Sequence, residues 1–196
     1  MKVIELGDKS EISFTFLTKD NRSVFQNRLK KFDCDKSRYN RVVRNAPLDN
    51  VTTLLFVDTR NDDIIGYLSY CCANLPIKSV EDVYPALEIK TFAVAREYQD
   101  TLLKYPSSKG TPLCADFILK IGVDILKTIS HFIVAAGYIL VDVDQTNKTE
   151  NFYKKTGIFV PLVGSPADHN YFFSVILPKE EDTSTISLSD LYLHLN

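Results

Sequence analysis

The chain of 196 residues lacks any apolar run as long as a membrane-spanning helix, which needs about 18 to 20 residues. Its opening stretch, MKVIELGDKSEISF, lacks the apolar core of a secretion signal. No segment rich in Gly, Ser and Pro divides the middle of the chain, and no internal repeat is present. We therefore expect a cytoplasmic protein built mainly from one globular domain, with no membrane partner.

Cysteine and histidine are also scarce, with 4 and 3 residues respectively. No CxxC pair and no Cys/His spacing typical of zinc ligands occurs, so we expect no metal site. Cys71 and Cys72 are adjacent, whereas Cys34 and Cys114 lie far from them, a pattern that favours reduced and mostly buried thiols. The histidines are isolated in the sequence: His131, His169 and His194. His131 falls on a predicted helix and is interpreted as structural.

Charges of the two signs nearly balance, with 23 Lys and Arg against 25 Asp and Glu. The net charge of -2 argues against attraction of the whole molecule to nucleic acid. One basic stretch nevertheless stands out between Asp20 and Arg44. Its cations are Arg22, Arg28, Lys30, Lys31, Lys36, Arg38, Arg41 and Arg44. They form either two solvated helix faces or a surface that contacts phosphates.

Hydrophobic periodicity predicts strands alternating with helices. Apolar residues at helical spacing indicate helices between residues 20 and 44, the second capped by Asp35, and another after Thr111, with Thr111 as its N-cap and Pro112 as its first residue. Short apolar runs predict strands at residues 2–6, TTLLFVD, IIGYLSYCCANL, PALEIKTFAV, YILVDVD and NYFFSVIL. The stretch AREYQDTLLKYPSSKGTP is interpreted as irregular. A helix separates PALEIKTFAV from YILVDVD, so these two strands are expected to be parallel.

The loop SSKGTPLCADF is a candidate anion site because it leads into a predicted helix N-terminus, where free amides attract negative charge. Gly110 lets the backbone approach a phosphate, Ser108 and Thr111 offer hydroxyls, and Lys109 offers charge. Pro112 removes one amide, however, so an ordinary loop with an N-cap is the alternative.

Two further residues are candidates for chemistry. Glu88 lies in the apolar strand ALEIKTFAV, where it is either a general base in a cleft or a carboxylate paired with Lys90. Tyr153 lies in NKTENFYKKTG, which predicts a short helix with Asn147 as N-cap, Glu150 closing a capping box and Gly157 as C-cap. Taken alone, Tyr153 is either a packing residue or a hydroxyl with a chemical role.

Several of these motifs resemble the GNAT acetyltransferase superfamily. LEIKTFAVAREYQD looks like the family's fourth strand and the start of its acyl-CoA motif, and YILVDVDQTNKTENFYKKTGIFVP looks like its fifth strand, fourth helix and next strand. The family pattern is matched, with an extra Ile158, by Asn147, Phe152, Tyr153, Lys154, Lys155, Gly157 and Phe159. FDCDKSRYN and the hairpin LLFVDTRNDDIIGYLSY resemble the branch that includes bacterial toxin–antitoxin acetyltransferases and their orphan relatives.

The resemblance implies an α/β (α+β) GNAT fold. Residues 1–178 would form the domain, and residues 179–196 a polar linker and C-terminal tail. The central sheet would be mixed and mostly antiparallel, with about six to seven strands flanked by helices. An acyl-CoA cleft would open where the fourth and fifth strands splay apart.

The sequence departs from the family at the pyrophosphate loop, which usually reads Q/R-x-x-G-x-G/A. Gln99 stands at the expected place, but an insertion, TLLKYPSSKG, displaces the glycine to Gly110. The phosphate cradle is therefore either Gln99 with its neighbours or Ser108–Thr111. We favour the second because it abuts the helix.

The resemblance also implies a mechanism of direct acetyl transfer from acetyl-CoA. Backbone groups of Phe92, Ala93 and Val94 would pair with the pantetheine arm, and Asn147 would bond to it or cap the helix. Glu88 would act as base on the amine, and Tyr153 would protonate the departing thiolate. A covalent intermediate on Cys114, near a helix N-terminus that could lower its pKa, is the less favoured route.

Three functions follow from this resemblance. The favoured one is an N-acetyltransferase for a primary amine of a small molecule or protein, in a chain that could form a homodimer. The second is a toxin-like enzyme that acetylates aminoacyl-tRNA and has an antitoxin-like partner, as the basic stretch suggests. The third is a non-catalytic acyl-CoA-binding or partner-binding module, as the altered loop suggests.

Overall fold

The computed structural model describes residues 2–5, 11–76, 83–104, 110, 112–131, 136–163 and 165–176, without the side chain of Asn147. The chain divides into two compact units. The first contains Met1–Ser69 and Thr91–Gly122, and the second contains Tyr70–Lys90 and Val123–Ile186. The predicted tail at residues 179–196 lies outside the described residues.

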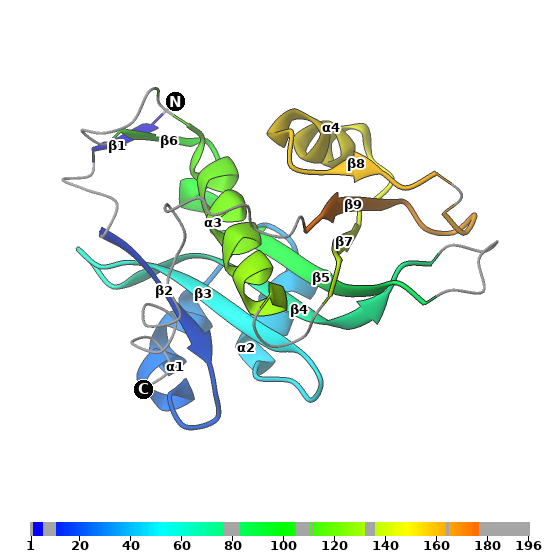
Figure 1. Cartoon of the computed structure of the whole chain (residues 1–196). Helices are drawn as coiled ribbons and strands as arrows, with labels where there is room; N and C mark the ends of the chain where they lie inside the picture. Colours follow the sequence, from blue (N-terminus) through cyan, green and yellow to red (C-terminus); the bar gives the residue numbers. More distant parts are fainter. Residues whose placement is uncertain are drawn as a thin grey trace. The chain divides into compact units, whose positions relative to one another are not determined.

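Groups of strands and helices follow one another along the chain (Figure 1). The strands are β1 (Lys2–Glu5), β2 (Ile12–Leu17), β3 (Thr52–Asp58), β4 (Asp63–Asn74), β5 (Pro85–Val94), β6 (Thr101–Lys104), β7 (Tyr138–Asp142), β8 (Val160–Pro161) and β9 (Tyr171–Val175). The helices are α1 (Arg22–Lys31), α2 (Ser37–Asn45), α3 (Cys114–Ile129) and α4 (Asn147–Thr156), with a 3-10 turn, η2 (Arg96–Tyr98).

These strands form two sheets. Seven pair in the order β2-β3-β4-β5-β7-β9-β8, while β1 pairs with β6 in a separate parallel ribbon. The larger sheet is mixed and mostly antiparallel, as predicted. The predicted parallel pairing of β5 with β7 is also confirmed.

Helical segments cover both faces of the sheet in the first unit. Gly122 of α3 lies so close to the sheet that a Cβ there would come within 2.9 Å of Leu68, with Phe56 also in contact. Phe32, just after α1, packs edge-on against Tyr67 with ring centroids 5.5 Å apart. Tyr67 and Leu68 are neighbours on β4, so they point to opposite faces, and α3 and the end of α1 cover opposite sides.

Strand register in the second unit determines which side chains share a face. Glu88 of β5 is opposite Leu140 of β7, which in turn is opposite Phe173 of β9. Val141 is opposite Phe172. Because successive side chains on a strand point to opposite faces, Glu88, Leu140 and Phe173 lie on one face and Val141 and Phe172 on the other.

Some local predictions were wrong. The strand β2 was not predicted, and β6 lies in a stretch interpreted as irregular. Asp35 does not cap α2: its φ is +65°, Lys36 is the N-cap residue, and the Asp35 carboxylate pairs with Arg96 at 3.1 Å. Pro112 precedes α3 rather than opening it, and its carbonyl accepts a hydrogen bond from Leu103 at 2.9 Å.

The caps of α4 are partly as predicted. Gly157 ends the helix with φ +68°, a conformation that glycine adopts without strain. The N-cap, however, is Thr146, whose hydroxyl accepts from the Thr149 amide at 3.3 Å, and Asn147 is the first helical residue. Glu150 accepts hydrogen bonds from Lys154 and Asn170 in place of a capping box.

Candidate active site

The predicted site residues fall in both units. Glu88 and Tyr153 belong to the second unit, as does Asn147 at the first turn of α4. The β5 residues Phe92, Ala93 and Val94 belong to the first unit, together with Gln99 and Gly110. Ser108, Lys109 and Thr111 lie outside the described residues.

The ladder between β5 and β7 ends before β5 does. Among the described residues its last pair is Ile89 opposite Val141, although β5 continues to Val94. Beyond Ile89, therefore, the edge of β5 that faced β7 no longer pairs with it. Such an edge can bind an extended ligand through backbone hydrogen bonds.

The side chain of Gln99 forms hydrogen bonds with backbone groups of the protein. Its side-chain amide donates to the carbonyls of Val94, at 3.1 Å, and Cys34, at 3.3 Å. In the same turn, the Arg96 amide donates to the Asp33 carbonyl at 2.7 Å. Gln99 thus ties the end of β5 to the segment after α1. In the other proposed cradle, Gly110 is exposed, and a Cβ there would meet nothing within 4 Å.

Tyr153 is held inside an aromatic cluster. It is only 6% exposed, and its ring packs edge-on against Phe152 and Phe159 at centroid distances of 5.2 and 5.6 Å. A tilted contact of 6.5 Å joins it to Phe172 of β9. The left-handed turn at Gly157 returns the chain to bring Phe159 onto the ring, so the extra Ile158 does not displace this contact.

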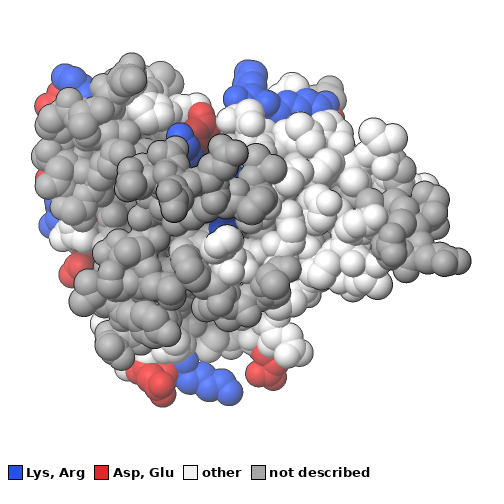
Figure 2. All heavy atoms as spheres, viewed as in Figure 1, with Lys and Arg blue, Asp and Glu red and all other residues white. Residues whose placement is uncertain are grey.

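The outer face of α4 is polar, which explains why the aromatic pair turns inward. Lys148, Lys154 and Lys155 are exposed, and Figure 2 shows cationic side chains gathered over this helix beside largely uncharged surface over β8 and β9. Lys154 also pairs with Glu150 at 3.0 Å, one helical turn earlier. The helix is therefore solvated on one side and packed on the other.

Glu88 combines features of both interpretations of its role. It is 9% exposed, and its carboxylate lies 2.7 Å from the Lys90 ammonium. The hydrogen bond to Glu88 raises the pKa of Lys90, so Lys90 stays charged at neutral pH. Glu88 is thus a largely buried carboxylate that is paired with the half-exposed ammonium of Lys90.

Glu88 and Tyr153 lie on opposite faces of the sheet. Tyr153 contacts Phe172, whereas Glu88 shares its face with Leu140 and Phe173.

His169, which is isolated in the sequence, forms an Asp–His pair in the structure. The Nδ1 atom of His169 lies 2.6 Å from Oδ2 of Asp142, 27 residues earlier. Its ring stacks on Tyr171 at 5.1 Å with an interplanar angle of 18°. The sequence signal that could have found it is the polar Asp142 at the end of an otherwise apolar strand.

The thiols do not support a covalent route. All four cysteines are free, with Cys34 and Cys114 buried, Cys71 half-buried and Cys72 exposed. Burial raises the pKa of the Cys114 thiol to about 12, the opposite of the lowering considered from its place near a helix N-terminus. No group of three or more potential metal ligands occurs in the described residues.

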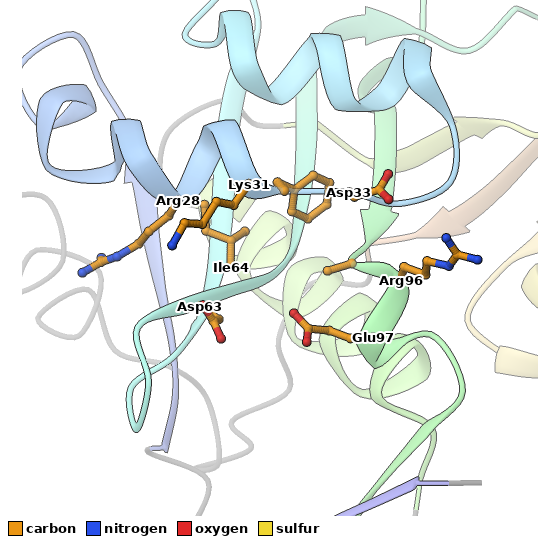
Figure 3. A pocket seen from close by; sticks show the side chains of 9 residues that line it. Arg28, Lys31, Asp33, Asp63, Ile64, Arg96 and Glu97 are labelled. Atoms are coloured by element: carbon orange, nitrogen blue, oxygen red, sulfur yellow. The ribbon is translucent and has the colours of Figure 1, made fainter.

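A pocket of about 430 Å³ lies in the first unit (Figure 3). Arg28 and Lys31 reach it from α1, and Arg96 and Glu97 from η2. The remaining lining residues are Phe32, Asp33, Asp63, Ile64 and Ala95. Two of its cations have carboxylate partners, since Arg28 pairs with Asp62 at 2.8 Å and Arg96 with Asp35.

No family model and no curated protein matches the chain. Solved structures do match it. A Tyr→Phe mutant of the toxin AtaT, bound to the C-terminus of the antitoxin AtaR and acetyl-CoA, is 17% identical, with 85% of this chain and 94% of that chain covered and a TM-score of 0.63. AtaT complexed with acetyl-methionyl-tRNAfMet is 21% identical, with coverage of 84% and 94% and a TM-score of 0.59.

A Tyr→Phe mutant of KacT also matches, at 13% identity, coverage of 85% and 95%, and a TM-score of 0.60. The TM-scores and coverages show that these proteins share their fold with this chain, and at such low sequence identities the likeness shows the fold alone. The GNAT fold expected from the sequence motifs is thereby confirmed. In the described part of the chain, no helix is both long and apolar enough to cross a bilayer.

Proposed function

We propose that the protein is an acetyl-CoA-dependent N-acetyltransferase that transfers the acetyl group directly to a primary amine of a small molecule or protein. The observation that carries this proposal is the early end of the β5–β7 ladder at Ile89 in a GNAT fold. AtaT, which shares the fold, has been solved with acetyl-CoA.

Backbone groups at the end of β5 would hold the co-substrate. The backbone of Phe92, Ala93 and Val94 continues as an extended strand past the last β5–β7 pair, and such an edge suits a strand-like pantetheine arm. We assign the pyrophosphate to the loop Ser108–Thr111, including Lys109 and Gly110. Gln99 supports this end of β5 through its bonds to Val94 and Cys34.

The side chains of Tyr153, Asn147 and Glu88 would carry the chemistry. Acetyl-CoA supplies an activated thioester when bound. We assign Tyr153 as the hydroxyl that protonates the departing thiolate, and Asn147, at the start of the same helix, as a contact for the pantetheine. Glu88 would hold the acceptor amine, because a buried carboxylate attracts an ammonium group.

Native mass spectrometry with and without acetyl-CoA tests binding and stoichiometry together, including whether the chain forms a homodimer. Transfer is then measured with spermidine, glycinamide, a lysine-containing peptide and methionyl-tRNA as acceptors. We expect one acetyl-CoA per chain and acetylation of one or more acceptors. Binding without transfer to any of them would instead support the non-catalytic module, and absence of binding would overturn the proposal.

A toxin-like acetyltransferase acting on aminoacyl-tRNA is the second candidate. AtaT has been solved with acetyl-methionyl-tRNAfMet and with the antitoxin AtaR. In this chain, Arg28 and Lys31 of the basic stretch line one pocket with Arg96, a set of cations suited to phosphates. Other cations of the stretch have structural roles, since Arg22 donates to the Ala46 carbonyl and Arg44 to that of Phe32.

Expression in a bacterial host distinguishes the two candidates. The toxin reading predicts growth arrest that Tyr153→Phe relieves, together with acetylated aminoacyl-tRNA in the arrested cells. Normal growth in the presence of active enzyme would leave the small-molecule or protein amine as the acceptor.

A further inference from the structure

His169 is held in one orientation by its neighbours. Its Nδ1 lies 2.6 Å from Oδ2 of Asp142, and its ring stacks on Tyr171. Asp142 is itself fixed, because its other oxygen accepts the Asn170 amide at 3.1 Å. The Asn170 side chain in turn donates to Glu150 of α4 at 3.0 Å. The pair is therefore anchored to β7, β9 and α4.

This geometry determines the tautomer of the imidazole. An ionised carboxylate can only accept hydrogen bonds, so Nδ1 of His169 must carry the proton shared with Asp142. The neutral ring then has its lone pair on Nε2. Nε2 lies 3.7 Å from Oδ2 of Asp168, whose side chain is 84% exposed. Nε2 can therefore accept a proton, and Asp168 can stabilise the resulting cation.

His169 is associated with the face of the sheet that bears Glu88. It stacks on Tyr171, which is registered opposite Asp142 and therefore points to the same face. Glu88, Leu140 and Phe173 share that face, because Leu140 and Asp142 alternate with Val141 along β7. Tyr153 packs against Phe172 on the other face.

Charged and titratable groups surround His169 from several elements. They are Asp142 of β7, Asp168 of its own loop, Glu88 of β5 and Tyr171 of β9, on which Lys90 also acts. The hydrogen bond to Asp142 raises the pKa of His169, and the charges of Asp142, Asp168 and Glu88 act in the same direction. Burial and the neighbouring carboxylates raise the pKa of Tyr171, so its phenol stays protonated.

We propose that His169 is the general base of the reaction, that Asp142 is its positioning residue, and that the acceptor amine approaches the sheet from the face of Glu88 and Tyr171. This inference rests on the proposed function. The amine and the departing thiolate separate on opposite sides of the carbonyl carbon, so a base on this face and an acid on the Tyr153 face suit the two proton transfers. Glu88, paired with Lys90, holds the amine, and His169 removes its proton.

The proton and electron balance is complete without a further reactant. An N–H bond of the acceptor ammonium breaks, and its proton goes to Nε2 of His169. The freed electron pair forms the new C–N bond, and the C–S bond breaks to release a thiolate. The thiolate takes the Tyr153 hydroxyl proton, and the second amine proton leaves to solvent as Tyr153 and His169 return to their starting states through water.

The test compares His169→Asn with His131→Asn. Asparagine at position 169 keeps a donor toward Asp142 but has no counterpart of Nε2, whereas His131 is an exposed histidine beyond the end of α3. With glycinamide and methionyl-tRNA as acceptors, we expect His169→Asn to lower kcat by about 100-fold or more and to remove one ionisation from the acid limb of the pH profile. His131→Asn should change neither quantity.

Asp142→Asn tests the positioning role separately. Without the carboxylate, the pKa of His169 should fall toward its ordinary value, so the acid limb should move to lower pH while the plateau rate decreases. The ring signals of His169 in NMR, assigned with the two histidine variants, should titrate at lower pH by the same amount. An unchanged NMR titration would contradict the role of Asp142.

The outcomes separate this inference from the proposed function. One outcome is that wild-type protein acetylates an acceptor while His169→Asn keeps the wild-type kcat and the acid limb of the pH profile. In that case the assignment of His169 as general base is wrong, and the acetyltransferase proposal stands. If wild-type protein acetylates neither acceptor, transfer to these amines fails, and the role of His169 fails with it.

Discussion

Glu88 and Tyr153 lie on opposite faces of one sheet, because Glu88 is registered with Leu140 and Phe173 whereas Tyr153 packs on Phe172. If one residue serves the acceptor amine and the other the leaving thiolate, substitutions should affect different steps of transfer. The two residues can therefore be tested independently.

Tyr153→Phe should lower turnover strongly and leave acetyl-CoA binding nearly unchanged. The phenyl ring keeps the contacts with Phe159 and Phe172 and removes only the hydroxyl. We expect kcat to fall by about 100-fold or more, the usual contribution of a positioned acid. The two measurements are kcat, from the rate of CoA release, and the Kd of acetyl-CoA, from calorimetry.

Tyr67→Phe is a matched control for Tyr153→Phe. The Tyr67 hydroxyl donates to the Tyr39 carbonyl at 2.8 Å, and Tyr67 is fully buried. Its loss should cost about 1 kcal/mol of stability with no change in kcat. Equal kcat for Tyr153→Phe and wild type would remove Tyr153 from the mechanism.

Glu88→Gln should lower kcat/KM for the acceptor by about tenfold or more, with the acetyl-CoA Kd unaffected, because glutamine retains the shape but cannot attract an ammonium group. Lys90→Met should have the reverse effect on acceptor binding. It leaves the Glu88 carboxylate without the cation now 2.7 Å away, so a cationic acceptor should bind more tightly. Similar steady-state constants in wild type and both variants would argue against any role for Glu88 in acceptor binding.

Arg60→Met should destabilise the protein. Arg60 holds the buried carboxylate of Asp58 through two hydrogen bonds of 2.8 and 2.6 Å. We expect a loss of about 1–3 kcal/mol in the free energy of unfolding, less than for a fully buried pair, because the Arg60 side chain is 37% exposed. Urea denaturation measures the loss.

The same pair predicts a pH dependence of stability. Burial acts to raise the pKa of Asp58, but the hydrogen bonds and charge of Arg60 outweigh it and hold the pKa below its ordinary value of 3.8. Its stabilising contribution is therefore present above pH 3.8 and is lost as pH falls through the lowered pKa. Arg60→Met removes the guanidinium but leaves burial and the hydrogen bonds from the backbone amide of residue 60 and from Tyr98. The loss should therefore begin at a higher pH than in wild type, and identical acid-unfolding curves would contradict this account.

Cys114 should be unreactive in the native protein, whereas Cys72 should react first. Cys72 is exposed, but Cys114 is fully buried and its pKa is raised to about 12. Peptide mass spectrometry after iodoacetamide treatment at neutral pH measures both sites, and denatured protein provides the fully labelled reference. If Cys114 were labelled as fast as Cys72 in the native state, a covalent intermediate on Cys114 would again be a candidate mechanism.

Local sequence patterns predicted the parts of the fold that depend on near neighbours. The strands β3, β4 and β5 follow from apolar runs bounded by turn residues, and the end of α4 follows from Gly157. Pairing partners are remote in sequence, and this explains the missed strand β6. TLLK becomes a strand because it pairs in parallel with Lys2–Glu5, almost 100 residues away, and the sequence around it contains no sign of that partner.

The choice between competing caps was also beyond the sequence. Thr146 and Asn147 are adjacent residues of types that cap helices well. The residue that keeps an extended backbone just before the helix becomes the N-cap. Thr146 is extended, with φ -119° and ψ 138°, so its hydroxyl can reach the Thr149 amide while Asn147 enters the helix.

By itself, the sequence determined most of the segments that form strands and helices and carried the motifs that resemble GNAT enzymes, because these depend on periodicity and on residues close together in the chain. The role of Tyr153 as a candidate acid is what that resemblance implies. Only the tertiary structure decided that Glu88 pairs with Lys90 and that Asp142 meets His169. It also decided which side chains share a face, because strand register joins β5, β7 and β9 across long intervals of sequence.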